Sequence, residues 1–335
     1  MVRVAALVGN LKEAAYRYRV GQYLAPLSGA GVEVEPRIFP RDAGAWRALL
    51  AEAGRFDVMW LLRRGLRRRE VAPVARLAPH LVFDLDDAIW GRDSNRRVAF
   101  SLRRRRRFRC AARAADLVLA GNEYLADHAR RFNAAVEVLP TCVAVERYRP
   151  RLAPAARAVL ELVWIGQAVT LRYLQGILGA LEEFASRRPA RLSVISDAFP
   201  ASRRLEIRPV PWSEEREAEA LAAGDVGLAP LPDDRWTRGK CGLKVLQYMA
   251  AGLPVVASPV GVQTEMIGGG ERGRLAASAA EWVERLTELA DAPAERERSG
   301  RAGRAFVERE YSLTRWAPHL AQTFAALAAP GEVRR

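Results

Sequence analysis

Two successive series of short apolar runs alternate with helical patterns along this 335-residue chain, and this alternation constrains the fold more than any other feature. The first series gives expected strands at residues 2–8, 33–39, 57–62, 80–85, 116–120 and 136–139. The second gives expected strands at residues 160–166, 191–196, 206–210, 225–231 and 253–257. Strands that alternate with helices form a parallel sheet covered on both faces. The sequence therefore predicts an α/β protein with two Rossmann-like domains in tandem.

A break in the alternation at residues 146–157, which contain Pro150 and Pro154, predicts a linker. We expect an N-terminal domain over residues 1–150 and a C-terminal domain over residues 151–312, each long enough to close its own core. A last helical pattern in residues 313–335 has no strand of its own to cover, so we expect it to pack back toward the N-terminal domain. A cleft between two such domains is where ligands are expected.

The apolar start of the chain is short and is followed by Lys12 and Glu13 without a cleavage site, and no apolar run reaches 18 residues. We therefore expect neither an exported protein nor a spanning helix. The cysteines at 110, 142 and 241 are widely spaced and form no C-x-x-C pair, which predicts neither a disulfide framework nor a thiolate zinc site. The expected location is the cytoplasm, without a bound metal.

The chain is strongly basic, with a formal charge of +14, and only three of its 53 cationic residues are lysines. Arginines cluster at residues 63–69 and 103–109, and such clusters attract nucleic acid, anionic lipid headgroups or a phosphorylated acceptor. No zinc-finger spacing, aromatic RNP strand or basic region with heptads is present, so nucleic acid is not an expected partner. A predicted helix at residues 96–115 either lies on the inner face of an anionic membrane as a peripheral contact or is a solvated helix of its own domain.

The segments after the strands are the candidate binding loops, because ligands bind at the carboxyl ends of parallel strands. The first of these loops lacks G-x-G-x-x-G, so it does not predict a dinucleotide site. Arg17 and Arg19 in this segment either bind a phosphate or are ordinary surface arginines. After the fourth expected strand, Asp84, Asp86 and Asp87 crowd together, which raises their pKa values and favours catalysis or hydroxyl binding over helix capping.

Residues 229–252 are expected to form a strand, a loop and a helix that begins near Gly239. They are not a Walker A loop, because Asp234 occupies the place of its first glycine and Cys241 that of its Ser or Thr. A helix N-terminus nevertheless favours a diphosphate.

Two of the three lysines, Lys240 and Lys244, are expected on one face of this helix, where their ammonium groups can approach phosphate oxygens. Gln247 lies further along a nearby face and could hydrogen-bond a ribose.

The run 239–258 resembles the donor-site motif of family 4 (group 1) glycosyltransferases of GT-B fold. Further matches follow in order along almost the whole chain, at residues 16–19, 84–90, 121–125, 164–174 and 258–265. Each match is weak alone, and their order makes the resemblance specific.

The resemblance implies two Rossmann-like domains that face a central cleft. It also implies a nucleotide-sugar donor held by the C-terminal domain, an acceptor held by the N-terminal domain, retention at the anomeric carbon, and no cofactor or metal. The expected catalytic residues are Asp86 and Asp87, and the expected acceptor-binding residues are Arg17 and Arg19. The expected donor-binding residues are Gly166, Thr170, Trp212 near the nucleobase, Arg238, Lys240 and Lys244 at the diphosphate, Gly242 at close backbone approach, and Gln247 at the ribose.

The chain departs from the family pattern at two places. Gly239 and Gln247 stand where the family has a Glu pair, so the sugar-facing carboxylate is missing unless Asp233 or Asp234 replaces it. A histidine common after the fourth strand is also absent, and Asp86 takes its place.

We therefore expect a hexosyltransferase that moves a sugar from a nucleoside diphosphate to a glycan or lipid-linked acceptor in envelope or exopolysaccharide synthesis. The loss of both motif glutamates favours one alternative, a non-catalytic GT-B protein that binds a nucleotide sugar or a polyanion. A second alternative is a sugar-nucleotide epimerase, which would act without an acceptor.

Overall fold

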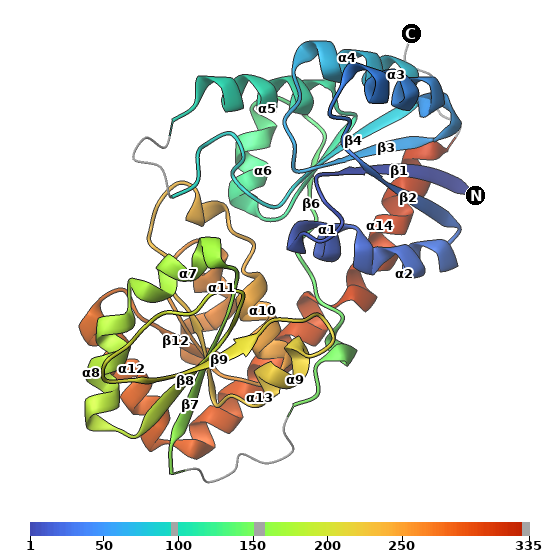
Figure 1. Cartoon of the computed structure of the whole chain (residues 1–335). Coiled ribbons are helices and arrows are strands. Elements are labelled where there is room, and N and C mark those ends of the chain that lie inside the picture. Colours follow the sequence, from blue (N-terminus) through green and yellow to red (C-terminus); the bar gives the residue numbers. More distant parts are fainter. Residues whose placement is uncertain (95–99, 151–157, 330–335) are drawn as a thin grey trace. The chain divides into compact units, whose positions relative to one another are not determined.

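The computed structural model describes residues 1–94, 100–150 and 158–329 and divides into two compact units (Figure 1). The first unit comprises Met1–Cys142, Asp234–Cys241 and Leu313–Arg335, and the second comprises Val143–Asp233 and Gly242–Ser312. The first long stretch thus ends at Cys142, before the expected boundary at residue 150, and residues 151–157 of the expected linker lie outside the described residues. The first unit is built from three separate stretches of the chain.

The first unit contains a parallel six-stranded sheet in the order β2-β1-β3-β4-β5-β6. All six strands expected from the sequence form, and their bounds are β1 Val2–Val8, β2 Val32–Ile38, β3 Val58–Leu62, β4 His80–Leu85, β5 Leu117–Ala120 and β6 Val136–Val138. The strand order reverses between β1 and β3, which is where sheets of this type bind ligands.

Helices cover both faces of this sheet (Figure 1). They are α1 Ala14–Arg19, α2 Leu24–Gly29, α3 Ala43–Glu52, α4 Arg68–Leu77, α5 Leu102–Ala114, α6 Glu123–Arg130 and α14 Leu313–Ala328. Successive strand residues point to opposite faces, so Met59 and Leu61 pack in the core with α4 and α5, while Trp60 meets Phe324 of α14 at a ring distance of 5.2 Å. The last helical pattern thus packs on the first sheet, within the first unit.

The predicted helix at residues 96–115 begins at Leu102, where the Ser101 hydroxyl accepts a hydrogen bond from the Arg104 N–H at 3.3 Å. Residues 95–99 lie outside the described part of the chain.

The second unit contains another parallel six-stranded sheet, in the order β12-β11-β10-β7-β8-β9. Its strands are β7 Leu160–Ile165, β8 Ala190–Ser196, β9 Glu206–Pro211, β10 Val226–Ala229, β11 Val255–Ala257 and β12 Gly273–Leu275. Its helices are α7 Ala168–Gln175, α8 Leu178–Arg187, α9 Glu217–Ala222, α10 Leu243–Ala250, α11 Val262–Ile267, α12 Ala279–Asp291 and α13 Pro293–Glu310. The sequence did not predict β12, because a three-residue strand that contains Gly273 and Arg274 has no apolar pattern.

The helix that the sequence predicts from Gly239 begins instead at Leu243. Asp234 Oδ1 accepts the backbone N–H groups of Trp236 and Thr237 at 2.8 and 2.9 Å and so starts a separate 3₁₀ turn, Thr237–Gly239. Gly242 then takes a left-handed φ of 70°, which interrupts any continuous helix. The prediction that Lys240 and Lys244 share one helical face is therefore wrong, since only Lys244 lies on α10.

Candidate functional site

A cluster of charged side chains lies where β3 and β4 end, in the first unit. Arg63 directly follows β3, and Asp86 and Asp87 follow its neighbour β4, so parallel pairing brings the three residues to one edge of the sheet. Arg63 Nε lies 3.2 Å from Asp86 Oδ1, and Arg63 Nη2 pairs with Asp87 Oδ2. Lys240 Nζ lies 2.8 Å from Asp87 Oδ1. The Asp87 carboxylate therefore bridges two cations.

Arg63 has an unusual backbone conformation for a side chain of its size. Its φ is +57°, the only positive value at a non-glycine position among the described residues. Its backbone N–H donates to the Asp84 carbonyl at 2.8 Å. A left-handed residue costs about 1 kcal/mol or more and persists where its surroundings hold it. From the sequence alone, Arg63 is only part of an arginine cluster. Its position directly after β3, the strand beside β4, was the signal that could have identified it as a site residue.

The two carboxylates of this cluster differ in exposure. The side chain of Asp86 is 15% exposed and that of Asp87 is 4% exposed. Burial raises the pKa of Asp86 above its ordinary value against the opposing charge of Arg63, and the neighbouring Asp87 raises it further. For Lys240, burial acts to lower the pKa, but the Asp87 carboxylate outweighs it and the pKa is raised. Asp86 is thus the carboxylate that a ligand can reach.

The loop that carries Lys240 is fixed by residues that follow β5. Asn122 Oδ1 accepts the Leu125 N–H at 3.0 Å and caps α6, while Asn122 Nδ2 donates to the carbonyls of Gly239 and Lys240 at 3.2 and 3.3 Å. The Cys241 thiol donates to the Asp86 carbonyl at 3.3 Å. These contacts hold the Lys240 backbone against the ends of β4 and β5.

The third carboxylate, Asp84, lies in the core rather than in this cluster. Its Oδ1 accepts a hydrogen bond from Arg19 Nε at 2.9 Å and lies 2.8 Å from Nη2 in an ion pair, and the Trp60 indole donates to Oδ2 at 3.1 Å. Burial raises the pKa of Asp84 to about 6, despite the opposing charge of Arg19. Arg19 is 1% exposed, so the guanidinium that the sequence assigned to acceptor binding is removed from the surface by this buried ion pair.

Arg17, the other expected acceptor residue, is half-buried, and its guanidinium lies 4.8 Å from the ring centre of Tyr18.

In the second unit, two of the expected donor residues meet at the carboxyl edge of the sheet. Gly166 follows β7, and Lys244 lies in the first turn of α10, which follows β10. Strands β7 and β10 are neighbours at the point where the strand order reverses. A Cβ at Gly166 would lie 2.9 Å from Lys244 Nζ, and this ammonium lies 5.1 Å from the ring centre of Trp164. The same Cβ would lie still closer to the Trp164 ring, so glycine at 166 leaves the space that the Trp164 ring and the Lys244 ammonium occupy.

Gly242 and Gln247 flank Lys244 but are buried. A Cβ at Gly242 would lie 2.6 Å from Met266 Sδ, in addition to the strain of the left-handed φ. Gln247 is 3% exposed, and its amide donates to the Tyr148 hydroxyl at 3.3 Å. In this structure the Gln247 amide, expected at a ribose, points into the interior of its own unit.

The remaining expected donor residues are more open. Trp212 directly follows β9, is 42% exposed, and donates its indole N–H to Glu217 at 2.9 Å. Thr170 lies on α7, and its hydroxyl donates to the Gln167 carbonyl at 3.0 Å. Arg238 is exposed and lies in the 3₁₀ turn Thr237–Gly239, which belongs to the first unit.

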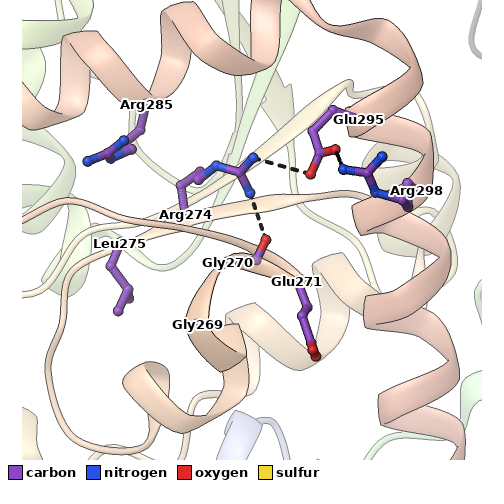
Figure 2. A pocket seen from close by; sticks show the side chains of 8 residues that line it. All are labelled: Gly269, Gly270, Glu271, Arg274, Leu275, Arg285, Glu295 and Arg298. Carbon is purple, nitrogen blue, oxygen red and sulfur yellow. Dashed lines mark hydrogen bonds and ion pairs between the residues drawn. The ribbon is translucent and has the colours of Figure 1, made fainter.

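A separate pocket of about 740 Å³ lies in the second unit, beside β12 (Figure 2). Figure 2 shows Arg274 reaching toward Glu295 and the Gly270 carbonyl, at 3.2 and 2.7 Å. The other lining arginines, Arg285 and Arg298, also pair with glutamates. No expected site residue lines this pocket, and its three arginines already pair with glutamates, so we assign it no ligand.

Within residues 1–94, 100–150 and 158–329, no group of three or more His, Cys, Asp or Glu side chains is arranged to hold a metal ion. None of the described helices is both long and apolar enough to cross a membrane.

Residues 160–292 match the model of the family described as Glycosyl transferases group 1. The whole chain has the GT-B fold, with two parallel six-stranded sheets covered by helices. The protein is therefore a glycosyltransferase that carries a group 1 domain.

Several solved structures share the fold at low sequence identity. Sucrose-phosphate synthase from Thermosynechococcus elongatus has a TM-score of 0.76 and 15% identity, over 99% of this chain and 100% of that one. HepE from Anabaena, solved with UDP-glucose, has a TM-score of 0.70 and 15% identity, over 97% of this chain and 100% of that one. A glycosyltransferase from Rickettsia africae has a TM-score of 0.73 and 9% identity, over 98% and 99% of the two chains. The comparison with curated proteins gave no match.

Proposed function

We propose that this glycosyltransferase transfers a hexose from a nucleoside diphosphate to a glycan or lipid-linked acceptor in envelope or exopolysaccharide synthesis. Retention at the anomeric carbon and the absence of a metal or cofactor requirement belong to the same proposal, because both are usual in the family that the donor motif resembles. The observation that carries it is the meeting of Gly166 and Lys244 at the reversal point of the second sheet, inside the region that matches the family model. The complex of HepE with UDP-glucose, a neighbour of the same fold, also supports a nucleotide-sugar donor.

The donor diphosphate gains negative charge as the sugar leaves, so groups that stabilise this charge lower the barrier. We assign this role to Lys244, whose ammonium lies over Trp164 beside Gly166. Lys240 assists by exchanging its contact with Asp87 for a phosphate oxygen, together with the exposed Arg238. Trp212 stacks on the nucleobase, since its ring is partly exposed at the end of β9.

Asp86 orients the acceptor hydroxyl or the transferred sugar, because it is the more exposed of the two clustered carboxylates. Asp87 holds Arg63 and Lys240 in place, so its role is positioning. Arg17 is the acceptor-binding residue that keeps partial exposure.

The first test is calorimetric titration of UDP, GDP, ADP and pyrophosphate into the protein at moderate salt. A shaped donor site predicts clear preference for one nucleoside diphosphate over pyrophosphate. Lys244→Ala should weaken that binding by about tenfold, as expected for loss of one charge-assisted contact. Arg208→Ala, which removes an exposed cation on β9, should not change it. Equal weak binding of all four compounds would contradict the proposal.

The turnover of the Lys240→Ala/Lys244→Ala variant gives a second test. Loss of both ammonium groups should lower turnover by about 100-fold or more, a larger effect than the fall in melting temperature from the lost contact between Lys240 and Asp87. Unchanged turnover would exclude these lysines from the reaction.

The competing function is binding of a nucleotide sugar without catalysis. It is favoured because Gly239 and Gln247 stand in place of the family's glutamates and because Gln247 is buried. Prolonged incubation with the preferred donor separates the two, because an enzyme releases the nucleoside diphosphate and a binding protein does not. Conversion of the donor sugar without any acceptor would instead identify an epimerase.

We also propose that the enzyme works in the cytoplasm, as a peripheral protein at the inner face of the membrane. The arginine-rich helices of the first unit support this location.

A further inference from the structure

The first unit carries a dense group of exposed arginines on α4, α5 and the loop before α4. We call it the α4–α5 arginine surface. Its members are Arg64, Arg67, Arg68, Arg69, Arg76, Arg103, Arg104, Arg105, Arg106, Arg109 and Arg113, all of them exposed. Glu70 is the single acidic residue of the two helices, and it lies 3.9 Å from Arg67.

The two arginine clusters that are separate in the sequence form one surface in the structure. Helices α4 and α5 pack against each other, and Gly65 allows the loop before α4 to approach closely, since a Cβ there would lie 2.9 Å from the Phe108 nitrogen. The pKa of Arg107 is lowered by burial and then by the charges of Arg103 and Arg67, which come from both clusters. Like charges are thus held together, and Glu70 is the only acidic side chain of α4 and α5 that offsets them.

Apolar side chains are exposed beside these arginines. Phe100 and Leu102, at the start of α5, are each 51% exposed, and Leu77 at the end of α4 is 42% exposed. The Arg105 guanidinium lies 5.3 Å from the Phe100 ring centre. Cations beside exposed aromatic and aliphatic side chains match a bilayer interface, which offers anionic headgroups and an apolar phase together. A nucleic acid duplex offers phosphates without that apolar phase.

We propose that the α4–α5 arginine surface docks on a bilayer that contains anionic phospholipids, with Phe100 and Leu102 entering the boundary between headgroups and acyl chains. This inference deepens the proposed function, since it names the surface that would hold the transferase at the membrane. It does not depend on the donor site of the second unit.

The test is a vesicle-binding titration of the full chain. Wild type should bind vesicles of phosphatidylglycerol in phosphatidylcholine and not vesicles of phosphatidylcholine alone, with affinity that falls as salt rises. The variant with Arg68, Arg69, Arg103 and Arg106 changed to Gln should bind at least about 100-fold more weakly, because each interfacial cation contributes severalfold to binding. A matched control changes Arg203, Arg204, Arg208 and Arg216 to Gln, which removes the same charge from the exposed surface of the second unit. This control should bind like wild type.

A second variant tests the apolar contact. Phe100→Ser/Leu102→Ser keeps every charge and should weaken vesicle binding by about tenfold. Equal losses in the two arginine variants, or tighter binding of wild type to random duplex DNA than to anionic vesicles at physiological salt, would overturn the proposal.

Titration of the preferred nucleoside diphosphate into the variant that lacks Arg68, Arg69, Arg103 and Arg106 keeps this proposal separate from the proposed function. Donor binding should be unchanged while vesicle binding is lost. Failure of vesicle binding alone would overturn the membrane surface, and failure of nucleoside diphosphate binding alone would overturn the donor site.

Discussion

Arg63 contacts both clustered carboxylates through one planar guanidinium, and lysine has no equivalent geometry. Its left-handed backbone places the side chain over Asp86 and Asp87. Through its charge, Arg63 also opposes the protonation of Asp86. A substitution at Arg63 should therefore change both the turnover rate and its dependence on pH.

Arg63→Gln should lower kcat by about tenfold to 100-fold with a smaller change in KM, because it acts on the positions of Asp86 and Asp87. Arg63 opposes the pKa rise of Asp86, so its removal raises that pKa further. If ionised Asp86 is needed, the acidic limb of the pH–rate profile must move to higher pH. Arg64→Gln, which changes the adjacent exposed arginine, is the control and should leave the profile in place when a soluble acceptor is used. A profile that does not move in Arg63→Gln would separate Arg63 from the reaction.

The Arg19–Asp84 pair belongs to stability rather than to the reaction. Arg19→Met leaves a buried carboxylate without its cation and should cost about 3–5 kcal/mol in the free energy of unfolding. Arg19→Met/Asp84→Asn removes the stranded charge while keeping an acceptor for the Trp60 indole, so it should be more stable than the single variant. Urea unfolding measures both. A double variant less stable than Arg19→Met would show that the buried charge is not the cause.

At the scale of elements, the start of α10 depends on one glycine. Gly242 precedes the helix at a φ of 70°, and this conformation directs the chain from the Lys240 loop into α10. A side chain there is strained whatever space surrounds it.

Gly242→Ala should therefore destabilise the protein by about 1–2 kcal/mol and weaken donor binding, because Lys244 lies in the first turn of the helix that follows. Gly179→Ala is the matched control, since position 179 lies in α8 and a Cβ there meets no atom within 4 Å. It should stabilise by about 0.5 kcal/mol. Thermal unfolding and nucleoside diphosphate titration check both. Equal effects of the two substitutions would rule out the left-handed φ as the cause.

The strands were predictable because buried parallel strands are continuous apolar runs, and the loops that follow them contain most of the residues assigned to the site. What the sequence could not predict depends on contacts between segments distant in sequence. The Lys240 loop is fixed by Asn122, which follows another strand, and Arg63 reaches Asp86 through a backbone conformation that no local pattern indicates. From the sequence Arg19 looks like a surface cation, because its buried partners, Asp84 and the Leu139 carbonyl, are distant in the chain and only the fold brings them to it.

At the scale of the whole molecule, the first unit depends on the helix that follows the entire second unit in the chain. Helix α14 packs on β1 and β3, and its Phe324 is fully buried against Trp60.

Phe324→Ala should lower the free energy of unfolding by about 3–5 kcal/mol, the usual cost of an aromatic side chain removed from a core. Gln322→Ala, at an exposed position of the same helix, should have almost no effect. Urea unfolding followed by the fluorescence of tryptophan compares them. A small loss in Phe324→Ala would mean that α14 is dispensable for the first unit.

The division of the first unit among three stretches sets an order for its assembly during synthesis. The strands of its sheet leave the ribosome first, but Trp60 lacks its contact with Phe324, and β1 and β3 lack the cover of α14, until residues 313–328 have been made. The second unit has all of its chain by Ser312, before that helix emerges. The unit that is translated first is thus the last to be complete, and the apolar area that α14 will cover is open to chaperones while the second unit is being made.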